Sequence, residues 1–259
     1  MNRRVLIAAG IALLVAVPGS IQAQRGRGGQ GGAPVTAKAA APVDLTGYWV
    51  SVVTEDWRYR MVTPKKGDYP SIPLNAEGRR VADAWDPAKD EAAGDPCKSY
   101  GAGNIMRVPG NVHITWEDDN TLRVDTDAGT QTRLFRFAGS PNSSGAPGWQ
   151  GNSAAQWEFA GGGRGGRGRG NAQDRGGDLK VVTTGMRAGY LQKNGVPYSG
   201  NAVVTEYFHR TIESNGDSWL IVTTMIEDPQ YLNQQFQRST HFKRLPDGST
   251  WSPSRCTAR

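Results

Sequence analysis

The chain is poor in the residue types that carry most enzyme chemistry. Its 259 residues include only three histidines and two cysteines. The histidines have no His-x-His or Glu-x-x-His spacing, and the cysteines lie too far apart for a Cys-x-x-Cys site. No Gly-x-Ser-x-Gly elbow is present, and the glycine-rich stretch lacks the strand–turn–helix frame of a phosphate-binding loop. We therefore predict no catalytic residue, no metal site and no cofactor.

Long apolar runs are also scarce. The run Val5–Val17 follows Arg3 and Arg4, is too short to span a bilayer, and ends at a Pro-Gly pair. This pattern predicts a secretory signal at residues 1–23 with cleavage after Ala23. We expect a periplasmic or secreted protein with no membrane span once the signal is removed.

The positive charge is concentrated in segments of low complexity. The formal net charge is +6, but nine of the 30 Lys and Arg residues lie in the signal, in residues 24–42 or in residues 161–177. Residues 24–42 are rich in Gly, Arg, Ala and Pro and predict a disordered linker, while residues 161–177 are an Arg/Gly-rich stretch that predicts a disordered loop. These two arms suit an envelope polyanion as a partner. The remainder is not basic, which argues against nucleic acid.

The rest of the chain, residues 43–259, has the pattern of a single all-β domain. One helix is expected over Ala76–Trp85 with Asn75 as its N-cap, and a further turn or two at Pro87–Ala93. Short strands in sequence-adjacent order favour an antiparallel meander barrel of about 8–10 strands, because closure removes exposed edges; a two-sheet sandwich is the alternative. The expected strands cover residues 44–53, 111–117, 121–127, 130–137, 153–159, 179–184, 202–213, 218–227 and 237–245.

The strongest local signal is the hairpin formed by Ala202–Glu213 and Ser218–Glu227. Between these runs, Asn215-Gly216 tolerates the positive φ of a two-residue type I′ turn. That turn would pair Ile212 with Trp219 and, by alternation, bring six side chains to one face. The six are Glu206, Phe208, Arg210, Trp219, Ile221 and Met225.

Two interpretations of this face remain open. Inside a barrel, Glu206 and Arg210 would be a buried, mutually neutralising ion pair, or they would fix the polar end of a ligand that contacts the apolar side chains. On the outer wall, Glu206 and Arg210 would be an ordinary solvated ion pair of little energetic value.

The cysteines fit an oxidising compartment. An even number of cysteines in an exported chain predicts one disulfide, Cys97–Cys256. In the chain-entropy model, a closed loop of this length stabilises the fold by about 4 to 5 kcal/mol.

A motif on the first expected strand is similar to the Gly-x-Trp signature of lipocalins. It is Gly47-Tyr48-Trp49. In lipocalins the tryptophan closes one end of the barrel beneath a basic residue of the last strand. The resemblance implies a lipocalin-like (calycin-type) barrel, with Lys243 or Arg244 as that basic residue.

A second resemblance covers most of the mature chain. Trp149-Gln150-Gly151, Leu179–Thr184, Thr205–Arg210 and Glu227–Leu232 resemble segments of a family of exported bacterial proteins, most of them called hypothetical. In that family a tryptophan lies close before the Leu-Val-Val-Thr-Thr run. The Arg/Gly stretch then stands as an insertion between two paired strands. This resemblance implies export and the barrel, but no activity.

Together these features predict a binding protein. The favoured function is to bind a small apolar or amphipathic molecule inside the barrel. One alternative is a filled barrel that serves as an envelope interaction or accessory protein through its loops and arms. A second alternative is a metal-dependent enzyme using His and carboxylates, which requires His113, His209 and His241 to converge.

Overall fold

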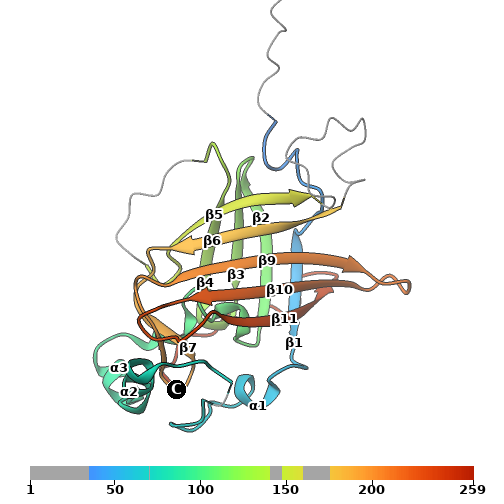
Figure 1. Cartoon of the computed structure of the whole chain (residues 1–259). Helices are drawn as coiled ribbons and strands as arrows, with labels where there is room; N and C mark the ends of the chain where they lie inside the picture. Colours follow the sequence, from blue (N-terminus) through green and yellow to red (C-terminus); the bar gives the residue numbers. More distant parts are fainter. Residues whose placement is uncertain (1–34, 70, 141–147, 160–175) are drawn as a thin grey trace, which may run out of the picture. The chain divides into compact units, whose positions relative to one another are not determined.

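Nine strands close into a barrel in the computed structural model, which describes residues 35–69, 71–140, 148–159 and 176–259 (Figure 1). Around the barrel they run in the order β1-β11-β10-β9-β6-β5-β4-β3-β2. Their bounds are β1 (Gly47–Val52), β2 (Asn111–Asp118), β3 (Thr121–Thr126), β4 (Gln131–Arg136), β5 (Asn152–Phe159), β6 (Gly177–Thr184), β9 (Val203–Ile212), β10 (Ser218–Glu227) and β11 (Phe236–Leu245).

The antiparallel barrel is confirmed with one exception. Strands β4 and β5 run parallel and share only two residue pairs, Phe135 with Ser153 and Arg136 with Ala154. Parallel neighbours cannot be joined by a tight turn, so the chain must cross between them. The nine expected strands all exist and differ from the observed ones only at their ends.

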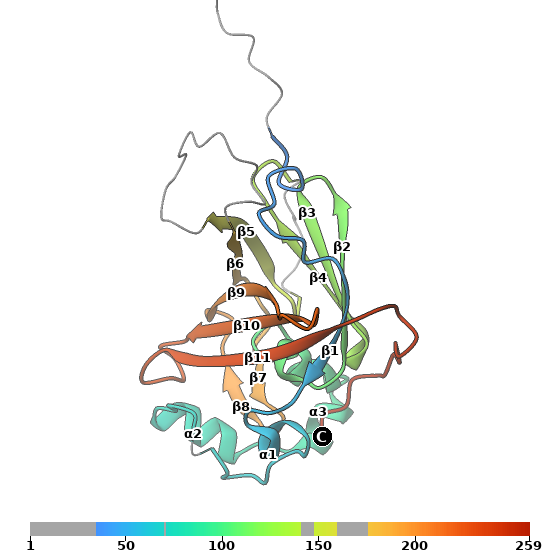
Figure 2. The same ribbon diagram turned by 90° about the vertical axis from the view of Figure 1, so that its right-hand side faces the viewer.

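A two-stranded sheet that the sequence did not predict interrupts the meander after β6. It consists of β7 (Gly189–Gln192) and β8 (Val196–Tyr198), whose four and three residues are too short to show alternation. This small sheet, the three helices and the C-terminus gather at one end of the barrel, which we call the helical end (Figure 2).

The helices are short. They are α1 (Trp57–Arg60), α2 (Ala76–Asp83) and α3 (Pro87–Ala92), with 3₁₀ turns η1 (Pro96–Tyr100), η2 (Ile105–Arg107) and η3 (Ala128–Thr130). The predicted N-cap is confirmed, because the Asn75 side chain accepts a hydrogen bond of 2.8 Å from the Gly78 N–H. None of the helices in the described residues is long and apolar enough to cross a membrane.

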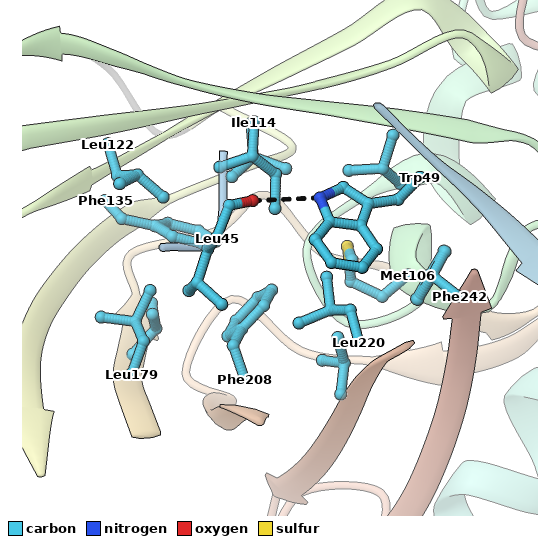
Figure 3. Close-up of a cluster of buried hydrophobic side chains, with 14 of the residues drawn as sticks. Leu45, Trp49, Met106, Ile114, Leu122, Phe135, Leu179, Phe208, Leu220 and Phe242 are labelled. Atoms are coloured by element: carbon cyan, nitrogen blue, oxygen red, sulfur yellow. Dashed lines mark hydrogen bonds between the residues drawn. The ribbon is translucent and has the colours of Figure 1, made fainter. Parts of the chain in front are cut away.

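Side chains fill the centre of the barrel. Trp49, Phe135, Phe208 and Phe242 are at most 1% exposed and belong to one cluster with aliphatic side chains from the surrounding strands (Figure 3). The rings of Phe135 and Phe208 meet edge to face with centroids 5.2 Å apart. The place where a lipocalin-like barrel would hold its ligand is therefore occupied by the protein's own core.

Trp49 lies beneath two cations at one end of this core. Its Nε1 donates to the Leu45 carbonyl at 3.0 Å, and the guanidinium carbons of Arg244 and Arg210 lie 5.7 and 5.9 Å from its ring. Arg244 comes from the last strand and is the register partner of Trp49. Of the two basic residues expected over Trp49, Arg244 lies there, whereas Lys243 bonds Asp217 at 2.8 Å.

The folded unit begins at Val35, eight residues before the expected boundary at Val43. The Ala37 carbonyl accepts from Trp157 Nε1 at 2.8 Å, and the Ala37 N–H donates to Asn120 at 2.8 Å. Residues 35–42 therefore belong to the domain and not to the linker. The predicted signal, linker residues 24–34 and loop residues 161–175 lie outside the described residues.

The predicted disulfide is confirmed. Cys97 and Cys256 are joined with an S–S distance of 2.10 Å. The tail before Cys256 is also held by Asp127, whose carbonyl accepts from the Ser254 N–H at 2.9 Å. The disulfide and this hydrogen bond together hold the C-terminal residues at the helical end.

Candidate functional site

The β9–β10 hairpin exists, but its turn is one residue longer than predicted. Glu213 and Asp217 are joined by a backbone hydrogen bond of 2.8 Å, which leaves three loop residues between them. Only the last of these, Gly216, has a positive φ, of +86°. This is the geometry of a type I turn followed by a left-handed residue, not of a type I′ turn.

The longer turn reverses the faces of the hairpin. Arg210 pairs with Leu220 instead of Ile221, and a one-residue shift moves the facing side chains to opposite sides of the sheet. Glu206 and Phe208 are completely buried in the barrel. The predicted register, and with it the single face shared by six side chains, is wrong.

The six predicted ligand-binding residues divide into two groups. Glu206, Phe208 and Arg210 face the lumen, where Arg210 also donates to the Asp44 carbonyl at 2.5 Å. Trp219, Ile221 and Met225 lie half-buried on the outer wall. There, an open groove of about 460 Å³ is lined by Val52, Thr54, Thr211, Glu213, Trp219, Ile221 and His241.

Glu206 has a different partner from the one expected. Arg133 on β4 donates to both of its carboxylate oxygens, at 3.0 and 2.5 Å, and neither side chain is exposed. Thr183 accepts a further hydrogen bond of 3.3 Å from Arg133. A desolvated, bidentate pair of this kind is a structural element of the core.

The three histidines do not converge. His113 stacks on Tyr48 with ring centroids 3.9 Å apart, His209 bonds Asp178 at 2.6 Å, and His241 bonds Glu55 at 2.9 Å. In the part of the chain that the structure describes, no group of three or more His, Cys, Asp or Glu residues is placed to hold a metal ion.

A different site lies at the helical end. It is a pocket of about 40 Å³ between α1, η2 and the end of β7. We call it the arginine pocket, and it is lined by Tyr59, Arg60, Val62, Asn104, Arg107, Val108, Pro109, Gln192 and Lys193.

Arg60 is the most buried cation of this pocket, with a side chain that is 1% exposed. Its Nε donates to the Arg107 carbonyl at 2.9 Å, and its Nη1 bonds Glu55. Its Nη2 is buried without an acceptor among the described residues, and so is Nε2 of Gln192. Buried donors normally have partners, and each one left unpaired costs about 1 to 3 kcal/mol.

The pocket carries more positive than negative charge. Asp56 accepts from Arg107 at 3.3 Å and also contacts Arg238 at 3.0 Å, while Glu55 is shared between Arg60 and His241. Two carboxylates, those of Glu55 and Asp56, thus pair with three guanidinium groups.

The pKa of Arg60 lies below its usual value. Burial lowers it, the charge of Glu55 opposes that effect, and the charge of Arg107 lowers it further. Burial likewise lowers the pKa of Arg107. Both shifts point to guanidinium groups that lack full compensation of their charge.

Lys193 adds a further cation at the rim of the pocket. Its ammonium group donates to the Tyr100 hydroxyl at 2.9 Å and lies 4.8 Å from the centre of the same ring. Neither contact neutralises its charge. Its place is set by the turn between β7 and β8, which Gly195 closes with a φ of +85°.

The sequence contained no signal for this pocket. Arg60 and Arg107 are separated by 47 residues, and neither belongs to a motif or to a regular strand. Their approach depends on α1 folding back over η2. Strand β1 ends at Val52, and the first helix begins after Asp56, which has a positive φ of 50°.

No protein-family model matches the chain, and no curated protein or solved structure matches it either. Fold and geometry therefore define its class: a closed β-barrel with a filled lumen and a cationic pocket at one end.

Proposed function

We propose that the protein binds a small amphipathic anion and holds its carboxylate or phosphate group in the arginine pocket. The observation that carries this proposal is the Nη2 of Arg60, which is buried with no acceptor among the described residues, while Arg60 lines a pocket together with Arg107 and Lys193. Guanidinium groups match carboxylate and phosphate oxygens through parallel N–H···O bonds. An oxyanion would supply both the missing acceptor and the missing negative charge.

The size of the pocket limits what enters it. A volume of about 40 Å³ is roughly three times what one water molecule needs. It suits a single acidic group and excludes the body of a larger ligand. Val62 also lines the pocket and is 65% exposed, so the body of the ligand would rest outside the pocket against this side chain.

The expected ligand is still amphipathic, but its acidic group would bind in the arginine pocket and not inside the barrel. The polar end was expected at Glu206 and Arg210 inside the barrel. Glu206 is already paired with Arg133, and the centre of the barrel is filled. The support for an acid-binding site lies instead outside the barrel, at Arg60 and Arg107.

Calorimetric titration with inorganic phosphate, acetate and octanoate would test the proposal. Octanoate is expected to bind more tightly than acetate, because it adds apolar contact to the same carboxylate. Lys193→Gln and Arg107→Lys should weaken binding by about tenfold or more, the usual loss when a hydrogen bond to a charged group disappears.

The matched control is Lys89→Gln, which removes an exposed lysine on α3 and changes the net charge as Lys193→Gln does. It should bind all three probes as the wild type does. If Lys193→Gln and Arg107→Lys also retain wild-type affinity, the arginine pocket is not the binding site.

A further inference from the structure

An exposed loop beside the arginine pocket concentrates apolar side chains. Trp57, Met61 and Val62 are 63%, 60% and 65% exposed. They are three of the five large hydrophobic side chains that are exposed in the described part of the chain, and they lie within six residues. Single exposed apolar side chains are ordinary, but a cluster marks an interaction surface. We call residues 57–66 the α1 loop.

The same loop is basic. Arg58, Lys65 and Lys66 are exposed, and residues 57–67 contain no Asp or Glu. Arg58 pairs with Asp68 at 3.1 Å, whereas neither lysine ammonium group has an acidic partner among the described residues. Exposed lysines thus flank an exposed apolar tip.

The position of the loop leaves this tip accessible. Figures 1 and 2 both place α1 at the margin of the helical end, beyond the end of β1. Met61 and Val62 follow α1 directly, and Val62 also lines the arginine pocket. The apolar tip and the pocket therefore share a border.

We propose that the α1 loop docks the protein on an anionic lipid surface. Trp57, Met61 and Val62 would enter the boundary between headgroups and acyl chains, where tryptophan rings are favoured. Lys65 and Lys66 would contact the acidic headgroups. We choose this partner because its charge is complementary to the loop. A bilayer places acidic headgroups above apolar acyl chains, and the α1 loop places lysines beside an apolar tip.

The energetics imply reversible binding. Three side chains bury little area, and each lysine near an acidic membrane surface adds about a fivefold gain in affinity. The proposal does not depend on anion binding in the arginine pocket, because neither lysine lines that pocket. If both proposals hold, the pocket opens next to the surface from which an amphipathic acid would be taken.

Vesicle cosedimentation with the chain lacking its predicted signal would test the docking. One set of vesicles is phosphatidylcholine alone, and the other contains phosphatidylcholine and phosphatidylglycerol in equal parts. Binding is expected only to the second set and should weaken as salt is added. Lys65→Gln combined with Lys66→Gln should lower the partition coefficient by about fivefold for each lysine, and Trp57→Ser should lower it as well.

Two control variants separate the α1 loop from general effects of charge and apolarity. Lys89→Gln removes an exposed lysine elsewhere, and Ile212→Ser removes an exposed apolar side chain at the end of β9. Both should partition as the wild type does. The arginines of the two Arg/Gly arms would also attract anionic vesicles, but all variants carry these arginines unchanged.

Either of two results would overturn the proposal. Unchanged partitioning of the Lys65/Lys66 and Trp57 variants would assign any vesicle binding to the arms. If the protein binds neither set of vesicles, the α1 loop does not dock on lipid, and its apolar tip would instead contact a protein partner. Phosphate titration without vesicles should be unaffected in the lysine variants, so failure of the docking and failure of the anion site can be told apart.

Discussion

Glu206 and Arg133 show how much the surroundings of one residue decide its role. Both charges are desolvated, and two hydrogen bonds join them. Removing one partner of such a pair typically costs about 3 to 5 kcal/mol, while replacing both by apolar groups of similar volume is often nearly neutral. Loss of function on changing Glu206 alone would therefore report on folding and not on ligand contact.

The ionisation of Glu55, which pairs with Arg60 of the arginine pocket, makes the stability of the protein depend on pH. Burial raises the pKa of its carboxyl group, but the hydrogen bond from His241 and the charge of Arg60 outweigh burial, so the pKa is lower than the usual 4.5. A carboxyl group with a lowered pKa in the folded state stabilises the protein above its unfolded pKa. That contribution is lost as the pH falls through the folded value.

We therefore expect Glu55→Gln to destabilise the protein most near neutral pH. The difference in free energy of unfolding from the wild type should shrink as the pH falls below about 4.5 and disappear at still lower pH. Urea unfolding at a series of pH values measures this difference. A difference that stays constant over the whole series would contradict the assigned cause.

At the scale of elements, the turn between β9 and β10 determines which residues face the core. Both strands carry apolar and polar residues on each face, so alternation alone does not identify the buried one. The loop of Ser214, Asn215 and Gly216 selects the register that buries Phe208 and Leu220. The N-cap of α2 differs, because its hydrogen bond joins residues only three apart in sequence.

Gly216→Ala tests the turn. Gly216 has a φ of +86°, which is unfavourable for any residue with a Cβ, and an added Cβ would have no atom within 4 Å to clash with. The cost of backbone strain alone should be about 1 to 2 kcal/mol in the free energy of unfolding. Ser214→Ala, in the same loop but without a positive φ, should stay within about 0.5 kcal/mol of the wild type in urea unfolding. Equal effects of the two changes would contradict the loop geometry.

At the scale of the whole molecule, two long-range connections hold the ends of the chain. Strand β1 pairs with both β2 and β11, so the first and last strands complete the barrel. Cys97 and Cys256, separated by 159 residues, then join the tail to the helical end. The same end carries the arginine pocket and the α1 loop.

Reduction of the disulfide should lower the stability of the whole barrel. The chain-entropy model gives a loss of about 4 to 5 kcal/mol for a loop of this length. Urea unfolding with and without a thiol reductant measures it as a shift of the transition midpoint. The double variant Cys97→Ala/Cys256→Ala should unfold near the reduced wild type and be insensitive to reductant. A wild-type transition that does not move would show that the bond adds no stability.

The sequence by itself determined the β class, the extent of nearly every strand, the capped helix after Asn75 and the disulfide. The strands and the helix depend on short-range chemistry, which is alternation along a strand or a capping side chain, and the disulfide was predicted because the chain has only two cysteines. These features could be predicted without knowledge of the tertiary contacts.

Only the tertiary structure decided the buried face of the β9–β10 hairpin, the parallel contact of β4 with β5, and the arginine pocket. One additional loop residue reversed a whole face, which no pattern within the strands could reveal. Arg60 and Arg107 lie together because segments distant in sequence pack there, and this packing buries one guanidinium nitrogen of Arg60 with no acceptor among the described residues.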